Sequence, residues 1–256
     1  MLGAFLTCEP ALTFRRFAQS MLPMLLRALL YLHIAAGFVG FFVAPVALAV
    51  RKGGQAHRRW GLVFFWAMVV AGTTSLLLAG LKLSLVPLTV ASASGLKFLL
   101  LTGLFTLYLA GFGYRALYLK QLGRGQQPAL SDWLTVGAGL PVFGFFVFWG
   151  LRHGAIPAIV FGGIGLMTAG RQLRTYLSHT PPEPKQWLRN HISGFVGAYI
   201  AAVSAFSATA LHFIPWPWNF LWPTLLGVPY LLWAQRRYMG GSSRLTPLSQ
   251  AEVSAG

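Results

Sequence analysis

The stretch "GLVFFWAMVVAGTTSLLLAGL", residues Gly61–Leu81, contains no charged residue. A transmembrane α-helix needs about 20 mostly apolar residues to cross the hydrocarbon core of a bilayer. This stretch therefore predicts a membrane-spanning helix over about residues 60–81.

Similar apolar runs fill most of the chain. They lie at about 28–50, 94–116, 133–150, 155–177 and 192–213, with a shorter run at 218–234 that contains Pro223 and Pro229. Hydrophobic residues make up 56% of the sequence and charged residues 9%, whereas soluble domains are about 25% charged. These features predict an all-α fold, an integral membrane helical bundle of seven transmembrane helices, or six if the proline-containing run does not cross.

The two ends of the chain lie outside the predicted transmembrane domain, residues 28–235. Residues 1–27 are expected to form an N-terminal extension, either as an amphipathic surface helix or as a misassigned start, with translation beginning at Met21 rather than Met1. Residues 236–256 are predicted to be a basic and then disordered cytoplasmic tail.

Lysine and arginine residues predict the orientation, because they are enriched in cytoplasmic loops. If the loop Arg51–Arg59 is cytoplasmic, fourteen of the twenty basic residues lie on that side. The N-terminus is then outside and the C-terminus inside a bacterial cytoplasmic (inner) membrane. Tryptophans favour membrane interfaces, and they fall at the same boundaries: Trp60, Trp133, Trp187 and Trp233 at the inner ends, and Trp149, Trp216, Trp218 and Trp222 at the outer ends.

Charge and cysteine content exclude several classes of function. The net charge of +16 comes from short clusters beside apolar runs, so the expected partner is the lipid bilayer and not a nucleic acid. The four acidic residues lie outside or at the edges of the apolar runs, which argues against an ion-driven carrier or pump. Cys8 is the only cysteine, which excludes an intramolecular disulfide and a cysteine-based metal site.

Small residues predict where helices touch. Gly, Ala and Ser recur at spacings of three and four in Phe161–Gly170 and Gly194–Ala210, a pattern that lets helix backbones approach closely. We expect the fifth and sixth spans to form the centre of the bundle, with Ser204 or Ser207 bonded across helices.

Four histidines lie at two levels of the membrane. His33 and His212 fall in the outer half, whereas His57 and His191 fall at the inner ends of their spans. Histidines on facing helices are the usual axial ligands of a transmembrane haem, and basic residues near the interface bind its propionates. The pattern predicts two pairs of ligands for haem iron, His33 with His212 and His57 with His191, with Arg58, Arg59 and Arg189 beside the inner pair.

The best specific hypothesis is therefore a b-type haem-binding or quinone-linked electron-transfer protein, with a redox partner or a second copy of itself. Each histidine also has a purely structural interpretation, as an interfacial ring or a helix cap. The alternatives are a small-solute binding or facilitated-transport protein without ion coupling, with Arg171 or the start of the sixth span supplying positive potential, and a structural membrane subunit. Hydrolase and phosphate-loop motifs are absent, so no catalytic residue is assigned and enzymatic activity stays open.

The segment "YLHIAAGFVGFFVAPVALAVRKGGQAHRRWGLVFFWAM", Tyr31–Met68, resembles a bacterial membrane-protein family known as domain of unknown function 2306. The resemblance rests on His33 and Gly37 in the first span, followed by His57, Arg58, Arg59 and Gly61 in a basic turn. The segments "NHISGFVGAYIAAVSAFSA" (Asn190–Ala208) and "WPTLLGVPYLLW" (Trp222–Trp233) are also similar, so the likeness covers most of residues 25–235. It implies a multi-span helical bundle, and the family has no established activity.

Overall fold

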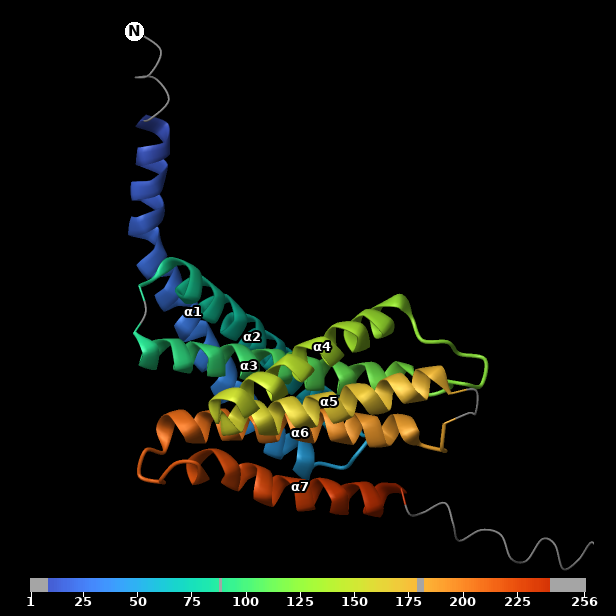
Figure 1. The fold of residues 1–256 in the computed structure, drawn as a ribbon. Coiled ribbons are helices and arrows are strands. Elements are labelled where there is room, and N and C mark those ends of the chain that lie inside the picture. The colour runs from blue at the N-terminus through green and yellow to red at the C-terminus, as the bar shows by residue number, and fades with distance from the viewer. Residues whose placement is uncertain (1–8, 88, 179–181, 240–256) are drawn as a thin grey trace, which may run out of the picture.

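The computed structural model describes residues 9–87, 89–178 and 182–239, together with their side chains except those of 9–20 and 90–92. Every regular element of this part of the chain is a helix (Figure 1). The helices are α1 (Glu9–Ala49), α2 (Gln55–Leu85), α3 (Val90–Arg115), the 3-10 turn η1 (Ala116–Tyr118), α4 (Leu130–His153), α5 (Ile156–Leu177), α6 (Gln186–Ala210) and α7 (Trp218–Met239). The predicted all-α class is confirmed.

Six of the described helices are long and apolar enough to cross a membrane. Their qualifying segments are Met21–Ala49, Gln55–Leu85, Ala93–Tyr118, Leu130–His153, Ile156–Leu177 and Gln186–Ala210. The expected seven spans overcount by one, because α7 contains two prolines, Asn219 and two basic residues that lower its apolar content. The fallback number of six agrees with the described helices.

The first and last helices reach beyond residues 28–235. Helix α1 begins at Glu9 and continues without a break into the first span, and α7 extends to Met239. The predictions for residues 1–8 and 240–256 lie outside the described residues.

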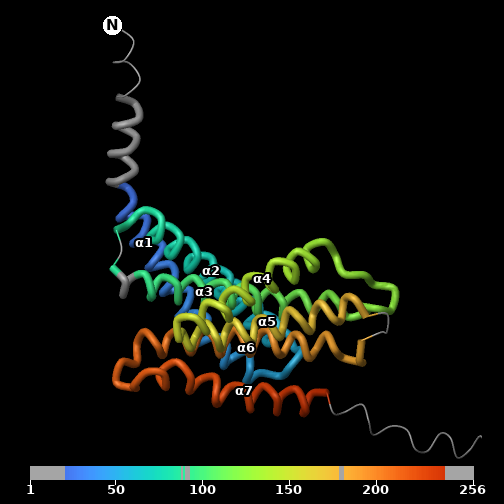
Figure 2. Tube along the Cα trace, viewed as in Figure 1, coloured from blue at the N-terminus to red at the C-terminus, as the bar shows by residue number. Residues whose placement is uncertain are grey.

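Helix α3 lies in the middle of the bundle (Figure 2) and contacts α2, α5 and α6. Helices α1 and α2 pair on one side, α4 and α5 pair on another, and α7 packs on α6. The expectation that the fifth and sixth spans form the centre is therefore wrong for α5, because its small residues face α4. A Cβ atom added to Gly162 would lie 3.0 Å from the backbone nitrogen of Val147 on α4.

Helices α3 and α6 cross in direct backbone contact. A Cβ atom added to Gly194 would lie 2.4 Å from the Cα atom of Gly113 and 2.6 Å from the carbonyl oxygen of Leu109. Only a hydrogen fits at this point, so the glycine of α6 brings the two backbones into direct contact.

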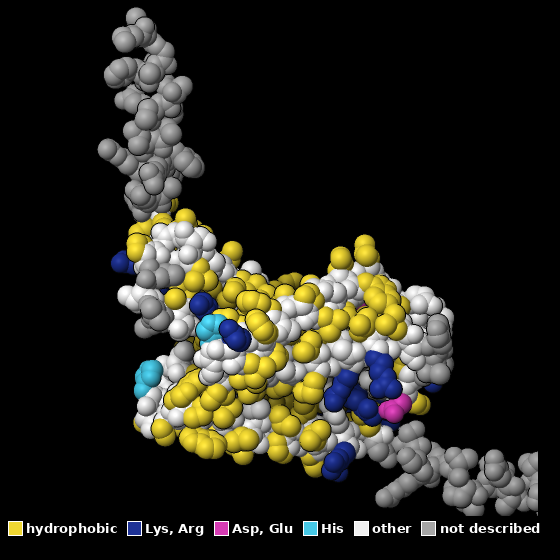
Figure 3. Space-filling model, viewed as in Figure 1, with side chains coloured by type: hydrophobic (Ala, Val, Ile, Leu, Met, Phe, Trp, Pro, Cys, Tyr) yellow, Lys and Arg dark blue, Asp and Glu magenta, His cyan; other side chains and the backbone are white. Residues whose placement is uncertain are grey.

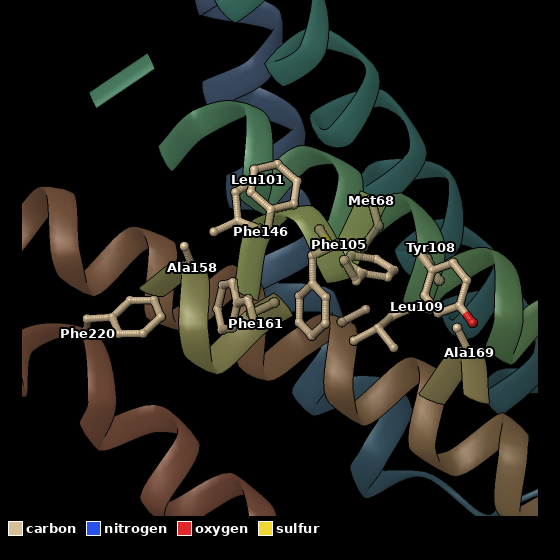
Figure 4. Close-up of a cluster of buried hydrophobic side chains, with 14 of the residues drawn as sticks. Met68, Leu101, Phe105, Tyr108, Leu109, Phe146, Ala158, Phe161, Ala169 and Phe220 are labelled. Carbon is tan, nitrogen blue, oxygen red and sulfur yellow. The ribbon is translucent and has the colours of Figure 1, made fainter. Parts of the chain in front are cut away.

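Aromatic rings fill the core between α3, α4, α5 and α7 (Figure 4). The Phe105 ring stacks on Phe161 with their centroids 4.6 Å apart, and its neighbour Phe143 meets it edge to face at 6.0 Å. Phe161 in turn lies 4.9 Å from Phe220 of α7. Offset and edge-to-face arrangements of this kind suit the quadrupoles of aromatic rings, so one continuous aromatic cluster joins four helices.

Helix α7 runs antiparallel along α6. The indole nitrogen of Trp222 donates to the Ser207 hydroxyl at 2.7 Å, and near the other end the Gln235 amide donates to Ser193 at 2.8 Å. The predicted hydrogen bond across helices is thus confirmed for Ser207. The Ser204 hydroxyl is fully buried and has no partner among the described residues.

Polar and apolar side chains are separated along the bundle. The visible flank is largely apolar, while lysine and arginine side chains gather toward the ends (Figure 3). Large apolar residues such as Phe42 and Leu226 remain 63% and 68% exposed on the outer surface, which is expected where a helix faces lipid. The chain is therefore a multi-pass membrane protein that contacts the bilayer along its sides.

Candidate functional site at the basic end of the bundle

The basic turn between α1 and α2 is tied to the end of α1. The Lys52 ammonium donates to the carbonyl oxygens of Ala47, at 3.3 Å, and Leu48, and the Arg58 guanidinium donates to Gly53 at 3.1 Å. The last carbonyls of a helix lack partners within the helix and carry negative potential. Part of this basic cluster therefore closes the turn, and partial burial there lowers the pKa of Lys52.

His57 is held by the same helix end. Its Nδ1 atom lies 2.9 Å from the carbonyl oxygen of Ala47. A carbonyl oxygen can only accept, so Nδ1 carries the hydrogen, and the neutral ring keeps a lone pair on Nε2.

His191 has an equivalent arrangement near the start of α6. Its Nδ1 atom donates to the carbonyl oxygen of Gly113 on α3 at 3.1 Å. This bond is possible because Gly113 and Gly194 let the two helices touch. The Nε2 atom of His191 therefore also carries a lone pair, and no described residue forms a hydrogen bond with either Nε2 atom.

The structure brings His57 and His191 together. Their ring centroids are 6.4 Å apart, and the ring planes make an angle of 77°. Phe195 adds an apolar surface beside His191, with the two ring centroids 4.7 Å apart. Phe195 itself packs against Phe64 of α2 at 5.7 Å, so the pair lies where α2 and α6 approach.

The two outer histidines are not brought together. The Nδ1 atom of His33 lies 3.0 Å from the carbonyl oxygen of Ala71 and 3.3 Å from the Thr74 hydroxyl, both on α2. His212 is exposed in the loop after α6. No ring contact or hydrogen bond joins His33 to His212 within the described chain. Of the two expected histidine pairs, only His57 and His191 are in contact.

The three arginines expected near the inner pair differ in their engagement. Arg58 is committed to the turn, and Arg189 forms an ion pair with Glu183 at 2.9 Å. Arg59 lines a shallow hollow with Gln55 and Trp60. Its guanidinium has no hydrogen bond or ion pair to any residue that the structure describes, so all of its nitrogens are available to an anionic group.

Two polar networks were missed by the sequence interpretation. Asp132 at the start of α4 is 2% exposed and accepts two hydrogen bonds from Arg115, at 2.6 and 2.9 Å. Tyr108 donates to Gln172 at 3.0 Å, deep between α3 and α5. Polar residues inside apolar spans usually face the bundle interior, so the position of Gln172 within the fifth run was the available signal.

A metal site with three or more protein ligands is not seen among the described residues. The described residues contain no group of three or more His, Cys, Asp or Glu side chains that could hold a metal ion. Two imidazoles alone suit an iron whose other four ligands come from a macrocycle.

No family model matches the chain, and neither a curated protein nor a solved structure matches it. The resemblance of residues 31–68 to domain of unknown function 2306 stays a prediction, as does the role of the histidines.

Proposed function

We propose that this multi-pass membrane protein binds one haem b between His57 and His191 and acts in electron transfer. The single observation that supports the proposal is the 6.4 Å separation of the two ring centroids, together with the lone pair that each ring keeps on Nε2. When bound, haem supplies one-electron chemistry whose potential depends on its ligands and their surroundings.

The separation can be compared with the geometry of a metal held between two imidazoles. A metal–imidazole bond of about 2.0 Å and a further ~1.2 Å to the ring centre place each centroid about 3.2 Å from the metal. Two imidazoles that held one iron between them would have ring centres about 6.4 Å apart, and the ring centroids of His57 and His191 are 6.4 Å apart.

The backbone bonds of the two rings support the same role. Metal-ligating histidines usually donate their other ring hydrogen to a carbonyl or carboxylate, which fixes the tautomer and the ring orientation. Ala47 and Gly113 provide such carbonyl oxygens, at 2.9 and 3.1 Å. Both rings in this tautomer would offer Nε2 as the ligand atom to a metal.

The residues around the two histidines bear on how a haem could bind there. Phe195 offers an apolar surface, and Arg59 is available for a propionate at the polar edge. The hollow lined by Arg59 includes neither histidine. Haem binding between the two rings would therefore require the surrounding side chains to make room.

We also propose that this end of the bundle lies in the cytoplasm of a bacterium, with the protein in the inner membrane. The support is the basic loop 51–59 and the other lysines and arginines at the same helix ends. A green fluorescent protein fused to the C-terminus should fluoresce, because it folds only in the cytoplasm. Activity of a C-terminal alkaline phosphatase fusion would instead reverse the orientation.

The decisive experiment is a haem titration of the purified full-length protein. Hemin added in detergent should give a Soret band that shifts on reduction with dithionite, at one haem per chain. His57→Ala and His191→Ala should each change the spectrum from a six-coordinate to a five-coordinate form and weaken binding.

Matched controls are His33→Ala and His153→Ala. His33 bonds to α2, and His153 bonds to the carbonyl oxygen of Trp149 at 2.9 Å, so both variants should keep the wild-type haem spectrum. Haem binding that is absent, or that is equal in all four variants, would refute the proposal. A protein that stays colourless but takes up a solute without ion coupling, or that tolerates all four substitutions, would favour the transport or the structural alternative.

A further inference from the structure

A second polar site lies at the same end of the bundle, between α3, α5 and α6. It is a cavity of about 180 Å³ at the point where α5 ends and α6 begins. Its polar lining includes Arg115, Lys120, Arg124, Tyr176, Lys185 and Asn190. Neither His57 nor His191 lines it, so it is separate from the proposed haem site.

A chain of hydrogen bonds leads to this cavity from the interior. The Tyr108 hydroxyl donates to the Gln172 carbonyl oxygen at 3.0 Å, and the Gln172 amide nitrogen donates to the Tyr176 hydroxyl at 2.6 Å. Because Tyr176 already accepts, its own hydrogen is left to donate. No acceptor for that hydrogen is found among the described residues, and Tyr176 lines the cavity.

Two further side chains of the lining have hydrogen-bond donors without a partner among the described residues. The side-chain oxygen of Asn190 accepts from Gln186 at 3.1 Å, which leaves the Asn190 amide hydrogens available. Arg115 uses its Nε and Nη2 atoms on Asp132 and keeps its other terminal nitrogen free for a further bond. The lining therefore has an excess of hydrogen-bond donors, and a ligand rich in acceptors fits it.

The side chains that line the cavity carry a net positive charge. Arg115 is already paired with Asp132. The lining has three further cations, Lys120, Arg124 and Lys185, and one carboxylate, Glu183. Glu183 is itself paired with Arg189 at 2.9 Å. Figure 3 shows lysine and arginine side chains crowded at this end, with a single acidic group among them.

The start of α6 adds to the positive potential. Residues Pro184–Trp187 line the cavity, and the first turn of the helix has neither a side-chain cap nor an acidic residue. The backbone N–H groups of Gln186, Leu188 and Arg189 already donate to Glu183 and Lys185, so this helix end contributes through its dipole, which favours an anion.

We propose that this cavity binds a phosphate group, supplied either by the headgroup of an anionic phospholipid or by free phosphate. A basic pocket between membrane helices at the headgroup level is a typical binding place for acidic lipids. Tryptophans favour the membrane interface, and two of them indicate that the cavity lies at the headgroup level. Trp187 lines the cavity and lies under Lys120, and the Trp133 ring centroid is 5.4 Å from that of Tyr176.

The test compares three probes on the purified full-length protein: phosphatidylglycerol, phosphatidylcholine and inorganic phosphate. Native mass spectrometry of the detergent-solubilised protein should retain phosphatidylglycerol in preference to phosphatidylcholine. The double variant Arg124→Gln/Lys185→Gln should weaken binding about tenfold or more, and Tyr176→Phe roughly two- to tenfold.

The matched control is Arg237→Gln, at the same end of the bundle on α7 but outside the cavity; its binding should stay within about twofold of wild type. Phosphatidylglycerol binding that inorganic phosphate does not displace identifies a lipid site, and saturable binding of inorganic phosphate alone identifies a free-phosphate site. Equal retention of the two lipids with no effect of phosphate, or an equal loss in the control variant, would overturn the proposal. Haem binding is measured separately by absorbance, so failure of either proposal leaves the other intact.

Discussion

Substituting Gly194 by alanine should separate the two central helices. The added Cβ atom would lie 2.4 Å from the Cα atom and 2.5 Å from the nitrogen of Gly113. Both atoms belong to the backbone, so no side chain can rotate out of the way. Ordinary contact begins at 3.4 Å, and α3 and α6 must therefore move apart by about 1 Å.

The expected loss of stability follows from this displacement. Overpacking a tight contact typically costs about 1–3 kcal/mol. For a chain of this size each kcal/mol shifts Tm by about 2–4 °C, so Gly194→Ala should lower Tm by about 2–12 °C. The displacement should also stretch the 3.1 Å bond from His191 to Gly113.

Thermal unfolding in detergent, followed by tryptophan fluorescence, measures the effect, since the chain has nine tryptophans. The matched control is Gly163→Ala on α5, where a Cβ atom would meet nothing within 4 Å. Alanine is favoured over glycine in a helix by up to about 1 kcal/mol, so this variant should be as stable as wild type or slightly more so. Equal Tm values for the two variants would refute the close crossing of α3 and α6.

Three further predictions concern polar groups. Arg115→Gln removes the charged partner of Asp132 and should lower the free energy of unfolding by about 1.5–3 kcal/mol. In an Asp132→Asn background the same substitution should lower it by less. An equal loss of stability in both backgrounds would contradict the ion pair. Ser207→Ala removes a buried acceptor from the indole of α7 and should cost about 1 kcal/mol or more, whereas Ser204→Ala, which removes a hydroxyl without a partner, should cost less in the same melts. Burial lowers the pKa of Lys52 from 10.5, so the folded protein loses the Lys52 proton at a lower pH than the unfolded chain does. The free energy of unfolding should therefore rise with pH just below 10.5. A Lys52→Met variant whose stability rises equally with pH in this range would contradict this.

The sequence determined which segments of the described chain form helices. Apolar length alone predicted runs at about 60–81 and 155–177, and the structure has α2 over Gln55–Leu85 and α5 over Ile156–Leu177. This works because a span needs about 20 apolar residues and polar residues interrupt it. The one miscounted span was α7, whose prolines and polar residues made its composition ambiguous.

Which faces meet was decided only by the tertiary structure. The sequence placed His57 and His191 at the same level, because position along a helix converts directly to depth. It also placed His33 and His212 in one half of the membrane, yet His33 bonds to Ala71 of α2. Depth does not specify the neighbour. The rotation of each helix and the choice of partner depend on packing, above all on the contact of Gly113 with Gly194, and that contact joins residues far apart in the chain.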